Sequence, residues 1–196
     1  MSKTITIGPY HPFLLEPERF DLQVEDDKIT DVKITLGYIH KGIEQLTTTK
    51  TYRQNVFLVE RICGICSNAH TMAFCQTVEK ILDIKVPDRA KYIRAIVAEL
   101  ERLHSHYLWL ALLAHALNEP EYFLRTMRDR EIVMHLLEWI SGNRVHYAVN
   151  TIGGVRRDLT PEPISAIKES LSKLKPLSNF IIDALDEKGV LGSKVA

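Results

Sequence analysis

The sequence DRAKYIRAIVAELERLHSHYLWLALLAHA, residues 88–116, has apolar side chains at steps of three and four residues. This spacing predicts one long amphipathic helix with a buried face. Pro87 prevents the helix from starting earlier, Asp88 can cap its first turn, and Asn118-Glu119-Pro120 ends it. The apolar positions are Ile93, Ile96, Val97, Leu100, Leu103, Tyr107, Leu108, Ala111 and Ala114.

Three other segments have helical patterns. The first runs from about Ser67 to Leu82, and the second from about Pro120 to Ser141, where Gly142 stops it. The third begins at Thr160-Pro161, and its interior Pro176 is expected to kink or split it. In the first of these helices the side chains expected to face inward are Thr71, Phe74, Val78 and Ile81.

The N-terminal part of the chain follows a different period. Between Thr4 and Leu36 apolar and polar residues alternate, which predicts strands, and Glu25-Asp26-Asp27-Lys28 has the composition of a hairpin turn. The fold class expected is therefore α+β and predominantly α. A small antiparallel β-sheet in residues 1–45 is expected to pack on a helical bundle in residues 46–196.

Composition and charge exclude several classes of protein. The 196 residues contain 45% hydrophobic and 26% charged residues, as in ordinary globular domains. Lys plus Arg and Asp plus Glu are balanced at 25 each, so no global field favours nucleic acid. The longest apolar run, Leu108–Leu117, contains His115 and is shorter than the roughly 20 residues that span a bilayer. The N-terminus lacks the pattern of a signal peptide, which predicts a cytoplasmic protein.

The segment Arg61-Ile62-Cys63-Gly64-Ile65-Cys66-Ser67-Asn68-Ala69-His70 carries the clearest chemical signal. Cys63 and Cys66 can direct both sulfurs to one point, and Arg61 beside them favours the thiolate that binds soft metals. His70 follows Cys66 by four residues and faces the same side if a helix has begun. From these residues alone, a structural or zinc site and a redox-metal site both stay open. Cys75, on the apolar face of the next helix, is predicted to be a buried hydrophobic residue.

The motif Arg-x-Cys-Gly-x-Cys-x-x-x-His resembles the N-terminal cysteine signature of nickel–iron hydrogenase large subunits, and the energy-converting, membrane-bound branch in particular. Several of the matching features are also similar to the 49-kDa (D) subunit of respiratory complex I, which typically lacks the cysteine pair. The retained cysteines favour the hydrogenase side. The other matching segments are Gly8–Pro12, Tyr38–Glu44, Pro87–His106, Ser141–His146 and Gly153–Asp158.

The resemblance implies a nickel–iron centre held by four thiolates, two from this motif and two from a second CxxC. It implies that Cys63 is a terminal nickel ligand and that Cys66 bridges nickel and iron. His70 would hydrogen bond near the bridging sulfur. Glu44 matches the acid that relays protons, and His11 matches a histidine that faces quinone in complex I, although a structural role is favoured for it here.

Several charged residues are expected to have ordinary roles. His104 and His106 lie two apart and cannot share a helix face, which favours packing or a local hydrogen bond. The mixed-charge segment that contains Arg125, Arg128 and Arg130 is expected to face solvent or another subunit. Residues 156–158 are either solvated or contact a neighbouring iron–sulfur subunit.

The chain has no second CxxC, which leaves three explanations: a fragment of a longer chain, a split subunit, or a relative without the metal. The main hypothesis is the N-terminal portion of an energy-converting hydrogenase large subunit that interconverts H2 with protons and electrons. Its expected partners are an iron–sulfur small subunit with its cluster, the segment that supplies the second CxxC, and membrane-arm subunits on the inner face of the cytoplasmic membrane. The alternatives are a quinone or electron-transfer subunit without nickel, and an assembly module whose CxxC binds zinc or nothing.

Overall fold

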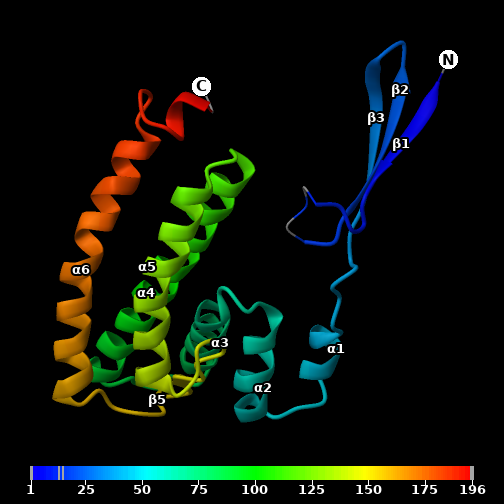
Figure 1. Ribbon diagram of the computed structural model, residues 1–196. Helices are drawn as coiled ribbons and strands as arrows, with labels where there is room; N and C mark the ends of the chain where they lie inside the picture. Colours follow the sequence, from blue (N-terminus) through cyan, green and yellow to red (C-terminus); the bar gives the residue numbers. More distant parts are fainter. Residues whose placement is uncertain (1, 13, 15, 195–196) are drawn as a thin grey trace. The chain divides into compact units, whose positions relative to one another are not determined.

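The computed structural model describes residues 2–12, 14 and 16–194 (Figure 1). The chain divides into two compact units, residues 1–46 and 47–196. Each unit has its own elements, and they are described in turn. Within the described ranges, no helix combines the length and apolar character needed to cross a membrane.

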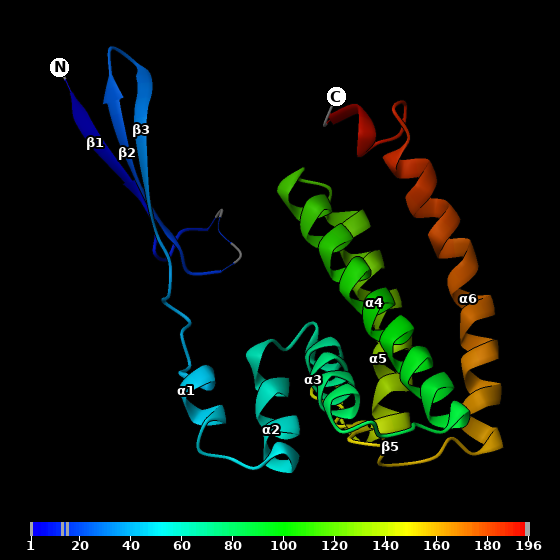
Figure 2. The same ribbon diagram turned by 180° about the vertical axis from the view of Figure 1, so that it is seen from behind.

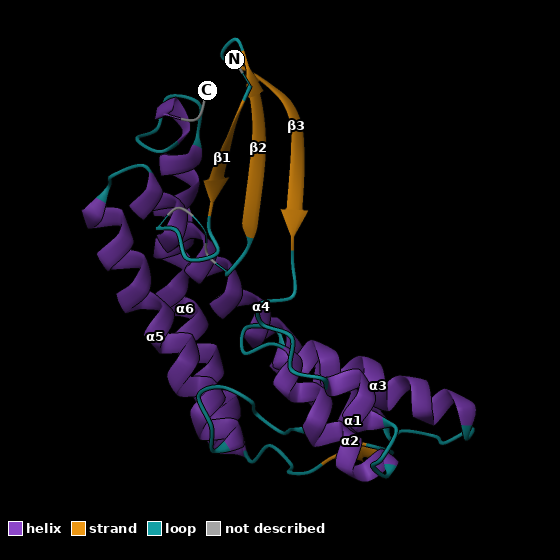
Figure 3. Cartoon of the chain, turned by 90° about the vertical axis from the view of Figure 1, so that its right-hand side faces the viewer, coloured by secondary structure: helices purple, strands orange, loops and turns teal. Residues whose placement is uncertain are grey.

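The first unit is built on a three-stranded antiparallel sheet in the order β1-β2-β3, and these strands run side by side in Figures 2 and 3. The hairpin predicted at residues 25–28 is confirmed: Asp26 and Asp27 adopt positive φ angles of 47° and 62° between β2 and β3. Short aspartates tolerate this left-handed backbone, so they make the tight reversal possible. The packing of the sheet on the helices stays a prediction. The elements are β1 (Lys3–Ile7), β2 (Arg19–Glu25), β3 (Lys28–Thr35) and α1 (Ile43–Thr47), the last of which continues across the boundary between the units.

The second unit is helical, and α4, α5 and α6 lie beside one another in Figures 1 and 2. The long helix predicted over residues 88–116 is confirmed as α4. Helix α5 ends where predicted, because Gly142 adopts a left-handed φ of 86°. The elements are α2 (Tyr52–Val59), the 3-10 helix η1 (Glu60–Ile62), α3 (Ser67–Ile81), α4 (Asp88–Ala116), α5 (Pro120–Ser141), β4 (Asn150–Thr151), β5 (Gly154–Val155), α6 (Pro161–Leu185) and the 3-10 helix η2 (Gly192–Lys194).

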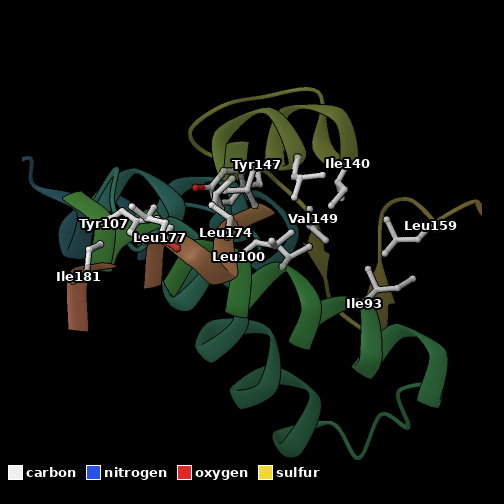
Figure 4. Close-up of a cluster of buried hydrophobic side chains, with 14 residues drawn as sticks. Ile93, Leu100, Tyr107, Ile140, Tyr147, Val149, Leu159, Leu174, Leu177 and Ile181 are labelled. Carbon is white, nitrogen blue, oxygen red and sulfur yellow. The ribbon is translucent and has the colours of Figure 1, made fainter. Parts of the chain in front are cut away.

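The hydrophobic core of this unit lies between α4, α5 and α6 and is completed by the segment that follows α5 (Figure 4). Leu137, Val97 and Val133 are fully buried in it. The apolar stripe along α4 thus faces its neighbours, as its spacing predicts. Other buried members are Ile93, Leu100, Tyr107, Leu136, Ile140, Tyr147, Val149, Leu159, Leu174, Leu177 and Ile181.

Three expectations about the helices are wrong. A split of α6 at Pro176 is wrong, because the helix runs unbroken from Pro161 to Leu185, and Leu174 and Leu177 beside the proline are each only 3% exposed; a kink there stays a prediction. Ile81 does not face inward but is 70% exposed in the last turn of α3. Asp88 does not cap α4, since its carboxylate accepts a hydrogen bond from Lys91 Nζ at 2.8 Å instead.

A buried ion pair joins α3, α4 and the β4–β5 hairpin. The Arg94 guanidinium donates to both carboxylate oxygens of Glu79, at 2.6 and 3.0 Å, and to the carbonyls of Thr151 and Gly154. Glu79 also accepts from the Gly153 N–H at 2.8 Å. Burial opposes ionisation of Glu79, but the hydrogen bonds from Arg94 and Gly153 outweigh it, so the pKa of Glu79 lies below its ordinary value. This pair connects the consecutive helices α3 and α4 to a hairpin that lies 57 to 60 residues after Arg94 in the chain.

Candidate metal centre

The two cysteines of the CGxC motif lie in the loop that joins η1 to α3, and both are partly exposed. The backbone N–H groups of Ile65 and Cys66 donate to Cys63 Sγ at 3.3 and 3.4 Å, and the Cys66 thiol also donates to this sulfur. Burial opposes ionisation of Cys63, but these three donors outweigh it and lower the pKa of its thiol. The loop is therefore folded so that a negative sulfur at Cys63 is stabilised.

The pKa of the Cys66 thiol is shifted in the opposite direction to that of Cys63. Burial, donation of its own proton to Cys63, and the nearby charge of Glu101 raise the pKa of Cys66 to about 12. Cys63 is therefore the more easily ionised of the two thiols. A cation bound by both sulfurs would displace the Cys66 proton, since metals coordinate the thiolate form.

His70 lies on the first turns of α3, four residues after Cys66. Its Nε2 is 3.5 Å from Cys66 Sγ, and its backbone N–H donates to the Cys66 carbonyl at 3.3 Å. The helix therefore begins early enough to bring His70 and Cys66 to the same side, as the spacing predicts. Its role beside a metal-bound sulfur stays a prediction.

Arg61 is held by the residue before it. Arg61 Nη1 donates to Glu60 Oε2 at 2.9 Å, and Glu60 Oε1 accepts from the Ala148 N–H at 2.6 Å. Glu60 is only 1% exposed, so this acid ties η1 to the segment after α5. The donors that lower the pKa of Cys63 are the two backbone N–H groups and Cys66, and the influence of Arg61 on the thiolate stays a prediction.

The N-terminus of α3 is capped by a side chain from another helix. Glu101 of α4, 5% exposed, accepts from the backbone N–H of Asn68 at 2.6 Å and of Ala69 at 3.0 Å, and from Ser67 Oγ at 3.4 Å. Burial nevertheless raises the pKa of Glu101, and these hydrogen bonds oppose that rise only in part. A carboxylate at this end of a helix also interacts favourably with the helix dipole.

His104, one turn further along α4, contacts the cysteine loop directly. Its Nε2 lies 3.0 Å from the Ile65 carbonyl, and its Nδ1 lies 2.8 Å from Arg130 Nη2 on α5. Arg130 Nε also donates to the His104 carbonyl at 3.0 Å. Burial and the Arg130 charge lower the pKa of His104 to about 4, so the ring is neutral at pH 7.

These contacts decide two expectations about ordinary roles. His104 is packed in the interior, as one of the two alternatives for it states, with 1% of its surface exposed. The side-chain partners of His104 are not local, since Ile65 is 39 residues away and Arg130 is 26 residues away. Arg130 points between α4 and α5 rather than to solvent or another subunit, and Arg125 lies with its guanidinium carbon 3.7 Å from the centre of the Phe180 ring. Among residues 156–158, Asp158 pairs with Arg89 at 2.7 Å on the surface.

Glu44 and His11 belong to the first unit, whereas the cysteine pair belongs to the second. Glu44 is exposed in the first turn of α1. His11 lines a hollow in the loop between β1 and β2, together with Pro9, Tyr10 and Glu16. The proton-relay role of Glu44 and the quinone role of His11 stay predictions.

The donor set fits part of a soft-metal site. Two cysteine sulfurs converge in a partly exposed loop, and a histidine nitrogen stands next to one of them, as thiolate-bound nickel or iron requires. Within the described part of the chain, no group of three or more His, Cys, Asp or Glu side chains is arranged to hold a metal. Cys63 and Cys66 can provide two thiolate ligands.

Comparison with protein families divides the chain between two related models. Residues 41–119, which include the cysteine loop and α4, match "Nickel-dependent hydrogenase". Residues 120–193, from α5 onward, match "Respiratory-chain NADH dehydrogenase, 49 Kd subunit". The boundary falls in the turn between α4 and α5.

Individual relatives align across both of these segments. The chain is 45% identical over 155 residues to the membrane-bound hydrogenase subunit alpha of Pyrococcus furiosus, covering 79% of this chain and 36% of that protein. It is 40% identical over 173 residues to the carbon monoxide-induced hydrogenase of Rhodospirillum rubrum, covering 88% of this chain and 48% of that protein. The chain thus spans between a third and a half of the length of these relatives.

A solved structure has the same fold. A chain of the archaeal membrane-bound sulfane sulfur reductase, a respiratory membrane complex, superimposes with a TM-score of 0.89 at 24% identity, over 98% of this chain and 52% of that one. This match shows that the two chains share a fold. The chain is thus similar to nickel-dependent hydrogenases over residues 41–119 and to the 49-kDa subunit of respiratory-chain NADH dehydrogenase over residues 120–193.

Proposed function

We propose that this chain is part of the catalytic large subunit of an energy-converting nickel–iron hydrogenase, an oxidoreductase that interconverts H2 with protons and electrons. The observation that carries the proposal is the convergence of Cys63, Cys66 and His70 at the start of α3. This loop lies inside the segment that matches nickel-dependent hydrogenases. A nickel–iron centre, when bound, supplies the redox site at which H2 is split or formed.

The residues of this chain have separate tasks in the proposed reaction. Cys63 and Cys66 provide two of the four thiolates, and the backbone N–H groups directed at Cys63 favour its anionic form. His70 Nε2 lies 3.5 Å from the Cys66 sulfur, and with the ring proton on Nε2 it would donate to a metal-bound thiolate and fix its orientation. Arg61 adds positive charge next to the pair. Glu44, which is exposed in the first turn of α1, carries protons to and from the metal centre, a role that suits a carboxylic acid.

The proposal includes partners outside this chain. A further segment or subunit supplies the second thiolate pair, and electrons leave through an iron–sulfur cluster on a small subunit. Membrane-arm subunits hold the assembly at the inner face of the cytoplasmic membrane. The names of two relatives, a membrane-bound hydrogenase and a respiratory membrane complex, support this location.

The test is the nickel and iron content per chain in the complex purified anaerobically from its source. About one nickel per chain is expected, and Cys63→Ser and Cys66→Ser should each lose nickel and H2 uptake. Cys75→Ser is the matched control, because Cys75 is fully buried on α3 and takes no part in the loop. It should retain nickel even where it lowers stability. A wild-type complex that retains its iron–sulfur partner and holds no nickel would contradict the proposal.

A second candidate is a quinone or electron-transfer subunit like that of complex I, because residues 120–193 match the 49-kDa family. In that function the complex binds no nickel, and the cysteines tolerate serine. His11 faces the acceptor, so His11→Ala should slow quinone reduction while Cys63→Ser should leave it unchanged. The two candidates thus predict opposite results for the same pair of variants.

A further inference from the structure

We infer that His104, held by Arg130, is a positioning residue for the metal-binding loop: it orients the peptide unit between Ile65 and Cys66 whose N–H binds the Cys63 sulfur. This inference rests on the proposed function, since it assigns a role at the same site. It adds two residues that lie outside the cysteine motif and come from two other helices.

The protonation state of the His104 ring follows from its neighbours. A guanidinium can only donate hydrogen bonds, so Nδ1, 2.8 Å from Arg130 Nη2, must accept. The single ring proton of the neutral imidazole is then on Nε2, which donates to the Ile65 carbonyl at 3.0 Å. Because His104 is 1% exposed, water does not compete for either contact. Arg130 therefore selects the tautomer that can hold the loop.

The geometry of one peptide unit transmits this contact to the sulfur. The Ile65 carbonyl and the Cys66 N–H belong to the same planar trans peptide, so they point in opposite directions. The carbonyl is held by His104, and the N–H on the other edge donates to Cys63 Sγ at 3.4 Å. Rotation of this plane would break both contacts together. His104 thereby holds the Cys66 N–H in place to donate to the Cys63 sulfur, although His104 itself contacts only the Ile65 carbonyl on this loop.

A second contact from α4 supports the same residue from its other side. Glu101, three residues before His104, binds the backbone N–H groups of Asn68 and Ala69. Residues three apart lie on one helix face. One face of α4 therefore contacts the backbone on both sides of Cys66. His104 binds Ile65 before it, and Glu101 binds Asn68 and Ala69 after it. The backbone on both sides of the sulfur is fixed before any metal arrives.

The test compares two amides at position 104 in the complex assembled without nickel, with Zn²⁺ as the probe and a chelator as competitor. A glutamine can place its N–H₂ at the position of Nε2 and keep the bond to Ile65, whereas an asparagine reaches only the position of Nδ1. His104→Gln should bind zinc within about threefold of wild type. His104→Asn should bind at least tenfold more weakly, as expected when an outer hydrogen bond to a metal site is lost. Binding that persists in the Cys63→Ser/Cys66→Ser double variant is subtracted.

The thermal midpoint of each variant separates positioning from general stability. Both amides remove the same ring from the interior, so a purely structural role would lower zinc affinity in both variants along with the midpoint. Equal zinc affinity in His104→Gln and His104→Asn would overturn the inference. The contrast holds whether or not the native complex contains nickel, so its failure is distinguishable from failure of the proposed function.

A second pair of variants applies if His104→Asn does not assemble. In Arg130→Lys a shorter side chain with one nitrogen replaces the two guanidinium nitrogens that bind the His104 carbonyl and Nδ1, so the contact that fixes the tautomer is weakened and zinc affinity should fall at least threefold. Arg125→Lys, on the same helix but stacked on Phe180, is the control and should bind zinc as wild type does. Unchanged affinity in Arg130→Lys would overturn the role given to this arginine and with it the inference.

Discussion

Replacing Arg94 by methionine tests the buried ion pair that joins α3, α4 and the β4–β5 hairpin. Methionine fills a similar volume but removes every hydrogen bond that the guanidinium makes. Glu79 then keeps only the Gly153 N–H as a partner while remaining about 6% exposed. The carbonyls of Thr151 and Gly154 lose their side-chain donor as well.

The size of the effect follows from the burial of both partners. Their side chains are 5% and 7% exposed, so the carboxylate left behind has little access to water. Removing one partner of such a pair costs about 3–5 kcal/mol, which corresponds to a roughly 150- to 5,000-fold increase in the open population. Arg89→Met is the matched control on the same helix, since its ion pair with Asp158 is more than 60% exposed on both sides. Such surface pairs contribute about 1 kcal/mol or less.

Hydrogen exchange followed by mass spectrometry can measure the difference in the assembled complex. Peptides that cover the end of α3 and the β4–β5 hairpin should exchange faster in Arg94→Met by about two to three and a half orders of magnitude. In Arg89→Met they should change by no more than about tenfold. If the two variants exchange alike, the pair does not hold these elements together and the reasoning fails.

Two further predictions concern stability alone. His104 should destabilise the fold in acid: its pKa falls from 6.5 to about 4 on burial, so its contribution is complete above pH 6.5 and is lost, by up to about 3 kcal/mol, as the pH falls to about 4. The free energy of unfolding of His104→Gln should therefore vary less between pH 7 and pH 4, and an identical dependence would contradict the assignment. Gly142→Ala should cost about 1 kcal/mol in urea unfolding, because the C-cap of α5 has a φ of 86° and alanine is strained there. No loss of stability would contradict this.

The helices could be predicted from the sequence where local signals agree. The stripe along residues 88–116 and the glycine after Ser141 are both local, and α4 and α5 have the predicted bounds. Pro176 shows the limit of such signals, because the helix propensity of one residue is outweighed by the burial of Leu174 and Leu177 on either side. The short α2 and the β4–β5 hairpin were not predicted, since their few residues give no clear period.

The candidate site could be predicted only in part, because some of its contacts join residues that are distant in the sequence. The cysteines and His70 fall within one short motif, whereas Glu101 and His104 act on partners more than 30 residues away in the sequence. A signal for both was nevertheless present. Glu101 follows Val97 by four residues and His104 follows Leu100 by four, so both polar side chains stand on the apolar stripe of α4. Polar residues at such positions need buried partners.

The Arg130–His104 contact also limits how these proteins can be recombined. The two matching family segments meet between α4 and α5, which makes residue 119 a natural place to join halves of different relatives. The arginine that sets the histidine proton, however, lies in the second half, and the histidine and cysteines lie in the first. A chimera joined at this turn would preserve the complete CGxC motif, but it would keep the contact to His104 only where the incoming half has an arginine at position 130. An exchange that carries α4 and α5 together keeps both side chains of this contact.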